Sequence, residues 1–213
     1  FSAYYQPHRK VGGDYYDYIR LNAQEVLFCV ADVSGKGVSA ALLMSNFQAN
    51  LRALASADKS LELLTRELNT KVMQSAKGEK FITFFVARYH QQKRELLYIN
   101  AGHNPPLLRC TDGIEVLRKG CPGLGILDEL VDIEVGRVSI SPGAFLLCYT
   151  DGLVEQENEG GKDFGLELLT NILAENHALS TKAFNALLVE HLSTYKGERP
   201  YIDDVALLAC RFF

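Results

Sequence analysis

The alternation of apolar and polar residues predicts a strand-rich protein with two pairs of helices. Segments rich in β-branched and aromatic residues are separated by short polar turns, which is typical of antiparallel strands. We expect strands at 1–5, 15–21, 25–31, 81–89, 95–101, 106–110, 114–117, 131–140, 144–149 and 205–212. We expect the first three to be neighbours, and Asp112-Gly113 predicts a tight hairpin between two later strands.

Helical patterns interrupt these strands twice. Small and apolar residues without β-branched runs predict a helix from about 38 to 55. Ser60 is a suitable N-cap for a second helix, whose expected buried face is Leu61, Leu64, Leu68 and Val72. Two further helices are expected at 165–175 and 180–195.

The order of the elements predicts the fold class. Consecutive strands joined by short turns form antiparallel sheets, and two helix pairs can cover the outer faces of two packed sheets. We therefore expect an α+β protein built as a four-layer αββα sandwich. A chain of 213 residues suits one large domain covering residues 1–213.

Four acidic segments lie at the ends of the expected strands. They are Gly12-Gly13-Asp14, Asp32-Val33-Ser34-Gly35-Lys36-Gly37, Thr150-Asp151-Gly152 and Asp203-Asp204. Carboxylates at strand ends can converge in space although they are far apart in the sequence. Hard oxygen ligands of this kind suit Mg²⁺ or Mn²⁺.

The glycine-rich segment after Asp32 does not match the common nucleotide-binding loops. A Walker A loop would need glycine at position 30 and a hydroxyl at position 37, where the chain has Val30 and Gly37. The segment formally matches a dinucleotide fingerprint, but two helices precede the next strand, so no compact βαβ unit follows. A nucleotide-binding oxidoreductase is therefore disfavoured.

The segment 100–106 places His103 beside Asn104 and two prolines, which indicates a rigid loop near a site. His103 could act as a general acid or make a structural hydrogen bond, and the sequence leaves both roles open.

Composition narrows the class of protein. The chain is 47% apolar and 23% charged, as soluble globular proteins are, and its net charge of −4 disfavours nucleic acid or an anionic membrane as a partner. No apolar run is long enough to insert into a membrane. Five cysteines without paired spacing indicate free thiols in a cytoplasmic protein.

Five motifs together resemble the PPM-type metal-dependent Ser/Thr phosphatases, and in particular the bacterial SpoIIE-like and RsbU-like branch. They are Val11–Asp17, Ala31–Val38, Asn100–Pro106, Tyr149–Glu155 and Asp203–Leu207. They occur in the family order and span nearly the whole chain.

The resemblance implies two Mn²⁺ or Mg²⁺ ions that activate a water for in-line attack on a phosphate monoester. By motif, Asp32 would bridge both ions and the attacking water. The Val33 carbonyl and Asp14 would complete the second site, and Asp151 and Asp203 would hold the first.

Two aspartates are alternatives in this scheme. Asp204 could replace its neighbour Asp203, and Asp17 could act directly or through water. Related eukaryotic enzymes usually place an arginine near the substrate phosphate and Glu-Asp at the first acidic segment, where this chain has Gly13-Asp14. Candidates for binding the substrate are Arg9, Lys10, Lys36, His103 and Asn104.

The resemblance also implies partners. Substrates of this branch are typically phosphoserine or phosphothreonine on small anti-sigma-factor antagonist (STAS) domains. Such catalytic domains usually follow a sensory or receiver domain, and a chain that begins at Phe1 is expected to be part of a longer regulatory protein, which a membrane could tether. The alternative function is a non-catalytic signalling module that binds a partner through the same cleft.

Overall fold

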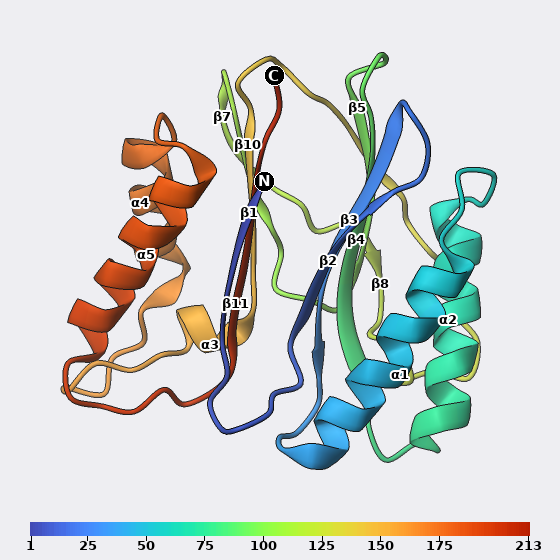
Figure 1. Cartoon of the computed structure of the whole chain (residues 1–213), viewed down its shortest axis with the longest axis horizontal. Helices are drawn as coiled ribbons and strands as arrows, with labels where there is room; N and C mark the ends of the chain where they lie inside the picture. The colour runs from blue at the N-terminus through green and yellow to red at the C-terminus, as the bar shows by residue number, and fades with distance from the viewer.

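The computed structural model describes all residues 1–213 and has four layers, in the order helices, sheet, sheet, helices (Figure 1). This arrangement confirms the predicted αββα sandwich. Three apolar cores hold the layers together: one lies between the two sheets, and one lies between each sheet and its helix pair.

The six-stranded sheet carries the glycine-rich turn that leads from β3 into a helix. Its strands are β2 (Tyr15–Arg20), β3 (Glu25–Val33), β4 (Ile82–His90), β5 (Glu95–Ala101), β8 (Gly120–Cys121) and β9 (Gly136–Ser139). The order is β2-β3-β4-β5-β8, and β9 also pairs with β5. All pairs are antiparallel except the two-residue pairing of β5 with β8.

The five-stranded sheet has the order β1-β11-β10-β6-β7 and is antiparallel throughout. Its strands are β1 (Ser2–Gln6), β6 (Leu107–Cys110), β7 (Gly113–Val116), β10 (Phe145–Tyr149) and β11 (Val205–Arg211). Every residue of β10 is buried, because one face packs on the other sheet and the opposite face packs on helices.

Two helix pairs cover the outer faces, as predicted. They are α1 (Val38–Leu54) with α2 (Leu61–Ala76), and α4 (Gly165–Asn176) with α5 (Thr181–Lys196); α3 (Asp151–Val154) is a single turn. The Ser60 hydroxyl accepts a hydrogen bond from the Leu63 amide at 3.1 Å, which confirms the predicted N-cap.

Two predictions of secondary structure were wrong. β1 pairs with β11 in the other sheet rather than with β2, because the loop between β1 and β2 crosses from one sheet to the other. Within the expected strand 131–140, only Gly136–Ser139 pairs with a neighbouring strand. Val131 is exposed, and the segment before β9 has no partner strand. The short elements β8 and α3 were not predicted.

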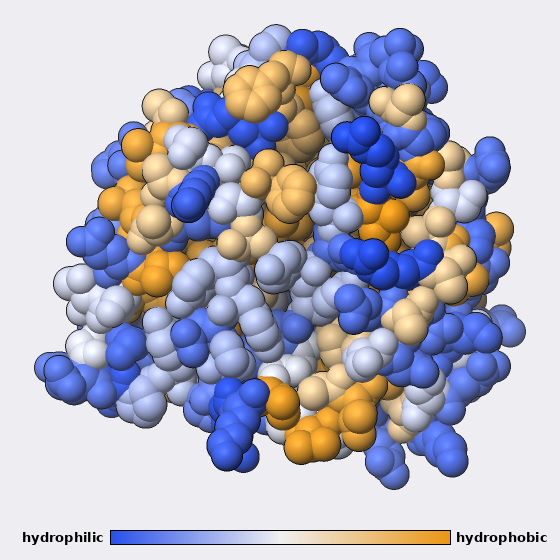
Figure 2. All heavy atoms as spheres, viewed as in Figure 1, coloured by the Kyte–Doolittle hydropathy of each residue, from blue (hydrophilic) through white to orange (hydrophobic).

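The surface mixes polar and apolar residues (Figure 2). Apolar atoms gather at its lower edge over the start of α1, where Val38 and Leu42 are exposed. No helix combines the length and the apolar character needed to cross a bilayer. All five cysteines are free, as predicted, and Cys29, Cys148 and Cys210 are buried.

A charged contact fastens α1 to the six-stranded sheet. The Arg52 guanidinium, in the last turn of α1, donates two hydrogen bonds to the buried Asp17 carboxylate at 2.7 and 2.6 Å. The Tyr15 hydroxyl and the Tyr18 amide also donate to this carboxylate. Because the guanidinium satisfies both oxygens, the charge of Asp17 is tolerated on the helix-covered face of β2.

We expect Arg52→Met to lower the free energy of unfolding by about 2 kcal/mol, because it leaves a buried carboxylate without its counter-charge while solvent still reaches the site. Urea unfolding at pH 7 measures this loss. The double variant Asp17→Asn/Arg52→Met should recover part of it, since no charge is then left unpaired. A double variant less stable than the single one would contradict this role of Asp17.

Candidate metal centre

The four acidic segments lie at one end of the sandwich, the lower end in Figure 1. Asp14 directly precedes β2, and Asp32 is the penultimate residue of β3. Asp151 begins α3, separated from β10 by Thr150, and Asp203-Asp204 precede β11. The candidate ligands therefore come from both sheets.

Two glycines allow these segments to approach one another. A Cβ on Gly12 would lie 2.1 Å from the Tyr5 hydroxyl and 2.2 Å from Asp204 Oδ2. A Cβ on Gly152 would lie 2.1 Å from the Asp204 carbonyl oxygen. A side chain at either position would push the acidic segments apart, so glycine is required there for contact.

Asp204 holds the loop that carries Asp14. Its two carboxylate oxygens accept hydrogen bonds from the backbone amides of His8 and Gly13, both at 2.7 Å. Its neighbour Asp203 has different partners: one oxygen accepts from the Asp204 amide at 2.8 Å, and the other lies 2.7 Å from Lys36 Nζ. Asp204 thus binds two backbone amides, whereas Asp203 pairs with a lysine side chain.

The carboxylates affect one another electrostatically. Burial and then the charge of Asp151 raise the pKa of Asp32 to about 7. Burial and then the charge of Asp203 raise the pKa of Asp151 to about 6. Burial and the charge of Asp32 hold the pKa of Asp14 well above its ordinary value. Mutual repulsion of this kind shows that these groups share one low-dielectric region.

The donor set fits a divalent cation. Asp14 Oδ2 is buried and has no hydrogen-bond partner, so a carboxyl oxygen is available there. The Val33 carbonyl oxygen lies 3.4 Å from the position of a Cβ on Gly13, the residue before Asp14. Every available donor is a carboxylate or carbonyl oxygen, the type that Mg²⁺ and Mn²⁺ prefer.

The side chains are not closed into a finished binding site. No three His, Cys, Asp or Glu side chains are close enough together to hold a metal ion. The partners described above account for the distances between the carboxylates. Asp203 is paired with Lys36, and backbone amides occupy both oxygens of Asp204. Unshielded carboxylates also repel one another.

The glycine-rich loop after Asp32 is fastened to the start of β4. The Ser34 amide and hydroxyl bond to the Phe81 backbone, each at 2.9 Å, and Lys80 Nζ donates to the Ser34 carbonyl at 3.0 Å. The chain then continues through α1 and α2 to the antiparallel strand β4, so no βαβ unit is formed. This confirms that the dinucleotide fingerprint was a chance match.

Three other predicted site residues lie apart from the carboxylates or contact none of them. Asp17 is opposite Cys29, on the helix-covered face of the sheet, and its oxygens are taken by Arg52; the structure does not place it in the acidic group. Arg9 is exposed and makes no ion pair, and the Asn104 side chain makes no hydrogen bond.

His103 is a buried structural residue in this fold. Its Nδ1 lies 2.9 Å from the Thr83 hydroxyl, and its amide donates to the Asn100 side chain at 2.7 Å. Thr83 is directly opposite Asp32 in the β3–β4 ladder. Burial lowers the pKa of the imidazole to about 4, and the nearby Tyr149 backbone only partly offsets this. His103 is therefore neutral at pH 7, next to the strand that carries Asp32.

Sequence reasoning missed Gln156, which connects two acidic segments. Its buried side-chain amide donates to the carbonyls of Glu157 and Pro200, at 3.1 and 3.2 Å, and accepts from the Ile202 amide at 3.2 Å. It thereby joins the segment after Asp151 to the segment before Asp203. No spacing or charge pattern distinguishes such a glutamine in the sequence.

Two more unpredicted residues adjoin the carboxylates. The Thr150 hydroxyl accepts from the Ala206 amide at 2.8 Å, and its hydrogen bond to Asp14 favours the ionised form of that acid. Burial and the charges of Asp204, Asp14 and Asp32 raise the pKa of the Tyr5 hydroxyl, which stays protonated. The position of Thr150 beside Asp151 was the only available signal.

A family model described as "Stage II sporulation protein E (SpoIIE)" matches residues 22–213. The chain belongs to the SpoIIE family. Its members are phosphatases of the metal-dependent PP2C class, so the resemblance stated from the motifs is confirmed.

Relatives of this SpoIIE-family chain include the phosphoserine phosphatase RsbU of Bacillus subtilis, with 27% identity over 73% of this chain and 46% of RsbU. The SiaA-PP2C domain of Pseudomonas aeruginosa has 23% identity and a TM-score of 0.84, covering 100% of this chain and 85% of that one. RsbX in complex with magnesium has 16% identity and a TM-score of 0.73, covering 99% and 94%. The chain spans less than half the length of the first curated relatives it matches.

We expect His103 to make the stability of the protein fall in acid. Its folded pKa of about 4 lies below the unfolded value of 6.5, so the unfolded chain takes up the proton first. The stabilisation from a neutral His103 is constant above pH 6.5 and is lost as the pH falls toward 4. The loss in the free energy of unfolding amounts to about 2–3 kcal/mol at pH 4.5.

Urea unfolding of the wild type and His103→Gln at pH 7.0 and 4.5 tests this. The stability difference between the two proteins should shift in favour of the glutamine variant at the lower pH. His191→Gln, at an exposed position, is the control. A difference that does not change with pH would contradict a buried neutral His103.

Proposed function

We propose that this domain catalyses the metal-dependent hydrolysis of phosphoserine or phosphothreonine on a protein. The observation that carries the proposal is the convergence of Asp14, Asp32, Asp151 and Asp203 from both sheets at one end of the sandwich. Membership of a phosphatase family supports the reaction class, and the full set of acidic segments argues against a non-catalytic binding module.

Two Mn²⁺ or Mg²⁺ ions are the proposed cofactors. Asp32 would contact both ions, Asp14 and the Val33 carbonyl would complete one site, and Asp151 and Asp203 the other. Ions bound there would supply the Lewis acidity that acidifies a water and offsets the charge of the phosphate. RsbX, a protein of the same fold, is described in complex with magnesium.

The other residues of the centre would position these ligands. Asp204 orients Asp14 by holding the His8 and Gly13 amides, so we assign it a positioning role and keep Asp203 as the ligand. Lys36 Nζ also donates to the Ile202 carbonyl at 2.6 Å, so its ammonium lies beside the acidic group. With Asp203 serving as a metal ligand, Lys36 would be free to bind the substrate phosphate.

The proposed substrate is a phosphorylated STAS-domain protein of the anti-sigma-factor antagonist type. Support comes from the match to RsbU and from the RsbU-like motifs. We further propose that residues 1–213 form one catalytic domain of a longer cytoplasmic protein with a sensory or receiver domain, because the matches cover only 37% and 46% of the first two curated relatives.

We expect Asp32→Asn to reduce hydrolysis of p-nitrophenyl phosphate by more than about 100-fold, because the amide lacks the charge that a ligand shared by two ions must supply. Activity should require Mn²⁺ or Mg²⁺ and disappear in EDTA. Asp112→Asn, in the exposed β6–β7 turn, is the matched control and should retain full activity.

The outcomes separate the candidate functions. Activity that survives EDTA would refute the two-metal mechanism. Bound Mn²⁺ without hydrolysis of any phosphorylated protein would instead support the partner-binding module. Release of phosphate from a phosphorylated STAS protein, but not from an unrelated phosphoprotein, would establish the substrate class.

We expect Lys36→Met to tighten Mn²⁺ binding about threefold, because the competing ion pair with Asp203 is half-exposed and worth under about 1 kcal/mol. Isothermal titration without substrate measures this change directly. In the assay the same variant should show a higher KM for the phosphorylated substrate. Weaker Mn²⁺ binding in this variant would mean that Lys36 positions Asp203 for the metal instead of competing with it.

A further inference from the structure

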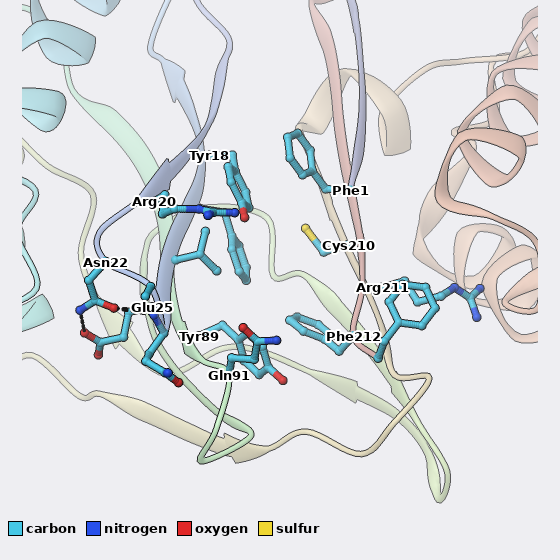
Figure 3. Close-up of a pocket in the computed structure, with 15 residues that line it drawn as sticks. Phe1, Tyr18, Arg20, Asn22, Glu25, Tyr89, Gln91, Cys210, Arg211 and Phe212 are labelled. Carbon is cyan, nitrogen blue, oxygen red and sulfur yellow. Dashed lines mark hydrogen bonds between the residues drawn. The ribbon is translucent and has the colours of Figure 1, made fainter.

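A hollow lies between the sheets at the end opposite the acidic group (Figure 3). β3 places Phe28 in its wall and Asp32 at the other end of the same strand, and β11 runs from the acidic segment up to Cys210 in the hollow. The volume is about 260 Å³. This is slightly below the usual range for small-molecule pockets, so it suits a ligand of one or two rings.

The walls are mostly aromatic. Tyr18, Phe28 and Tyr89 line the hollow from the six-stranded sheet, and Phe1 and Phe212 line it from the other side. The Tyr89 and Phe212 ring centroids are 4.7 Å apart, and Phe1 stacks on Tyr18 at 4.3 Å. Each pair is in contact, so the paired rings form continuous aromatic walls, and such walls favour a planar ring packed against them inside the hollow.

Among the charged side chains around the hollow, the Arg20 guanidinium has no partner within the protein. Arg20 projects across it toward the hydroxyl end of Tyr18 and makes no hydrogen bond or ion pair within the protein (Figure 3). The one nearby acid, Glu25, accepts a hydrogen bond from Asn22 at 2.8 Å and lies 4.0 Å from the Arg88 guanidinium.

The other polar groups offer no competing charge. The Arg211 guanidinium points away from the hollow, donates to the carbonyls of His177 and Leu179, and lies over the Phe145 ring. Burial raises the pKa of the Cys210 thiol to about 12, so no thiolate forms there. The local balance of charge therefore favours an anion at Arg20.

We propose that this hollow is a binding site for a small planar aromatic carboxylate. The ring would pack inside the hollow against its aromatic walls, and the carboxylate would accept two parallel hydrogen bonds from the Arg20 guanidinium, which matches a carboxylate in shape. The site is separate from the acidic group and does not depend on the proposed phosphatase reaction.

Binding of 2-naphthoate to the 213-residue chain, followed by titration calorimetry, tests the proposal. We expect one site per chain and binding at least tenfold weaker for the neutral analogue 2-naphthamide. Arg20→Gln should weaken naphthoate binding about tenfold, since hydrogen bonds between charged groups are worth about 1.5–3 kcal/mol. Lys71→Gln, an exposed lysine on α2, should leave it unchanged.

A second variant tests the location. Val26→Phe adds volume to the wall of the hollow and should abolish binding, while circular dichroism confirms that the variant is folded. Amide shifts on adding naphthoate should map to β2, β3 and the end of β11. Equal affinity for the amide and the acid, an unchanged affinity in Arg20→Gln, or no saturation at about 1 mM ligand would each overturn the proposal.

Discussion

The confinement of several carboxylates to one partly buried region is the constraint on which the rest of the molecule depends. Ionised Asp14, Asp32 and Asp151 repel one another there, and burial adds to the cost of their charge. The fold offsets this with backbone amides on Asp204 and the ammonium of Lys36 on Asp203. A region built in this way gains stability from any cation that enters it, which links its electrostatics to its proposed chemistry.

The sandwich keeps the carboxylates in place by fixing the distance between its sheets. The inter-sheet core spaces β3 from β10 and β11 along their length, and the buried His103 packs near the lower end of this core. The Gln156 side chain then joins the two acidic segments of the five-stranded sheet through hydrogen bonds to their backbone. A change that alters sheet separation would move ligands from opposite sheets relative to one another, whereas a change on a helix surface would not.

Much of this arrangement was predictable because its signals are local. Strand periodicity, the Ser60 cap and the Asp112-Gly113 turn depend on a few neighbouring residues, and the structure agrees with each. Sheet membership is not local: β1 looks like a partner for β2 but pairs with β11, more than 190 residues away. Asp17 illustrates the same limit, since its position near Asp14 in the sequence says nothing about which face of the sheet it occupies.

By itself, the sequence determined the αββα class, the family and the identity of the acidic segments, because hydrophobic period and short motifs record local geometry. The tertiary structure alone decided how the aspartates divide their roles. Asp203 and Asp204 are adjacent and chemically identical, yet one meets a lysine and the other two backbone amides. Those partners come from loops distant in the chain, so the role of each carboxylate depends on the packing of segments that no local pattern describes.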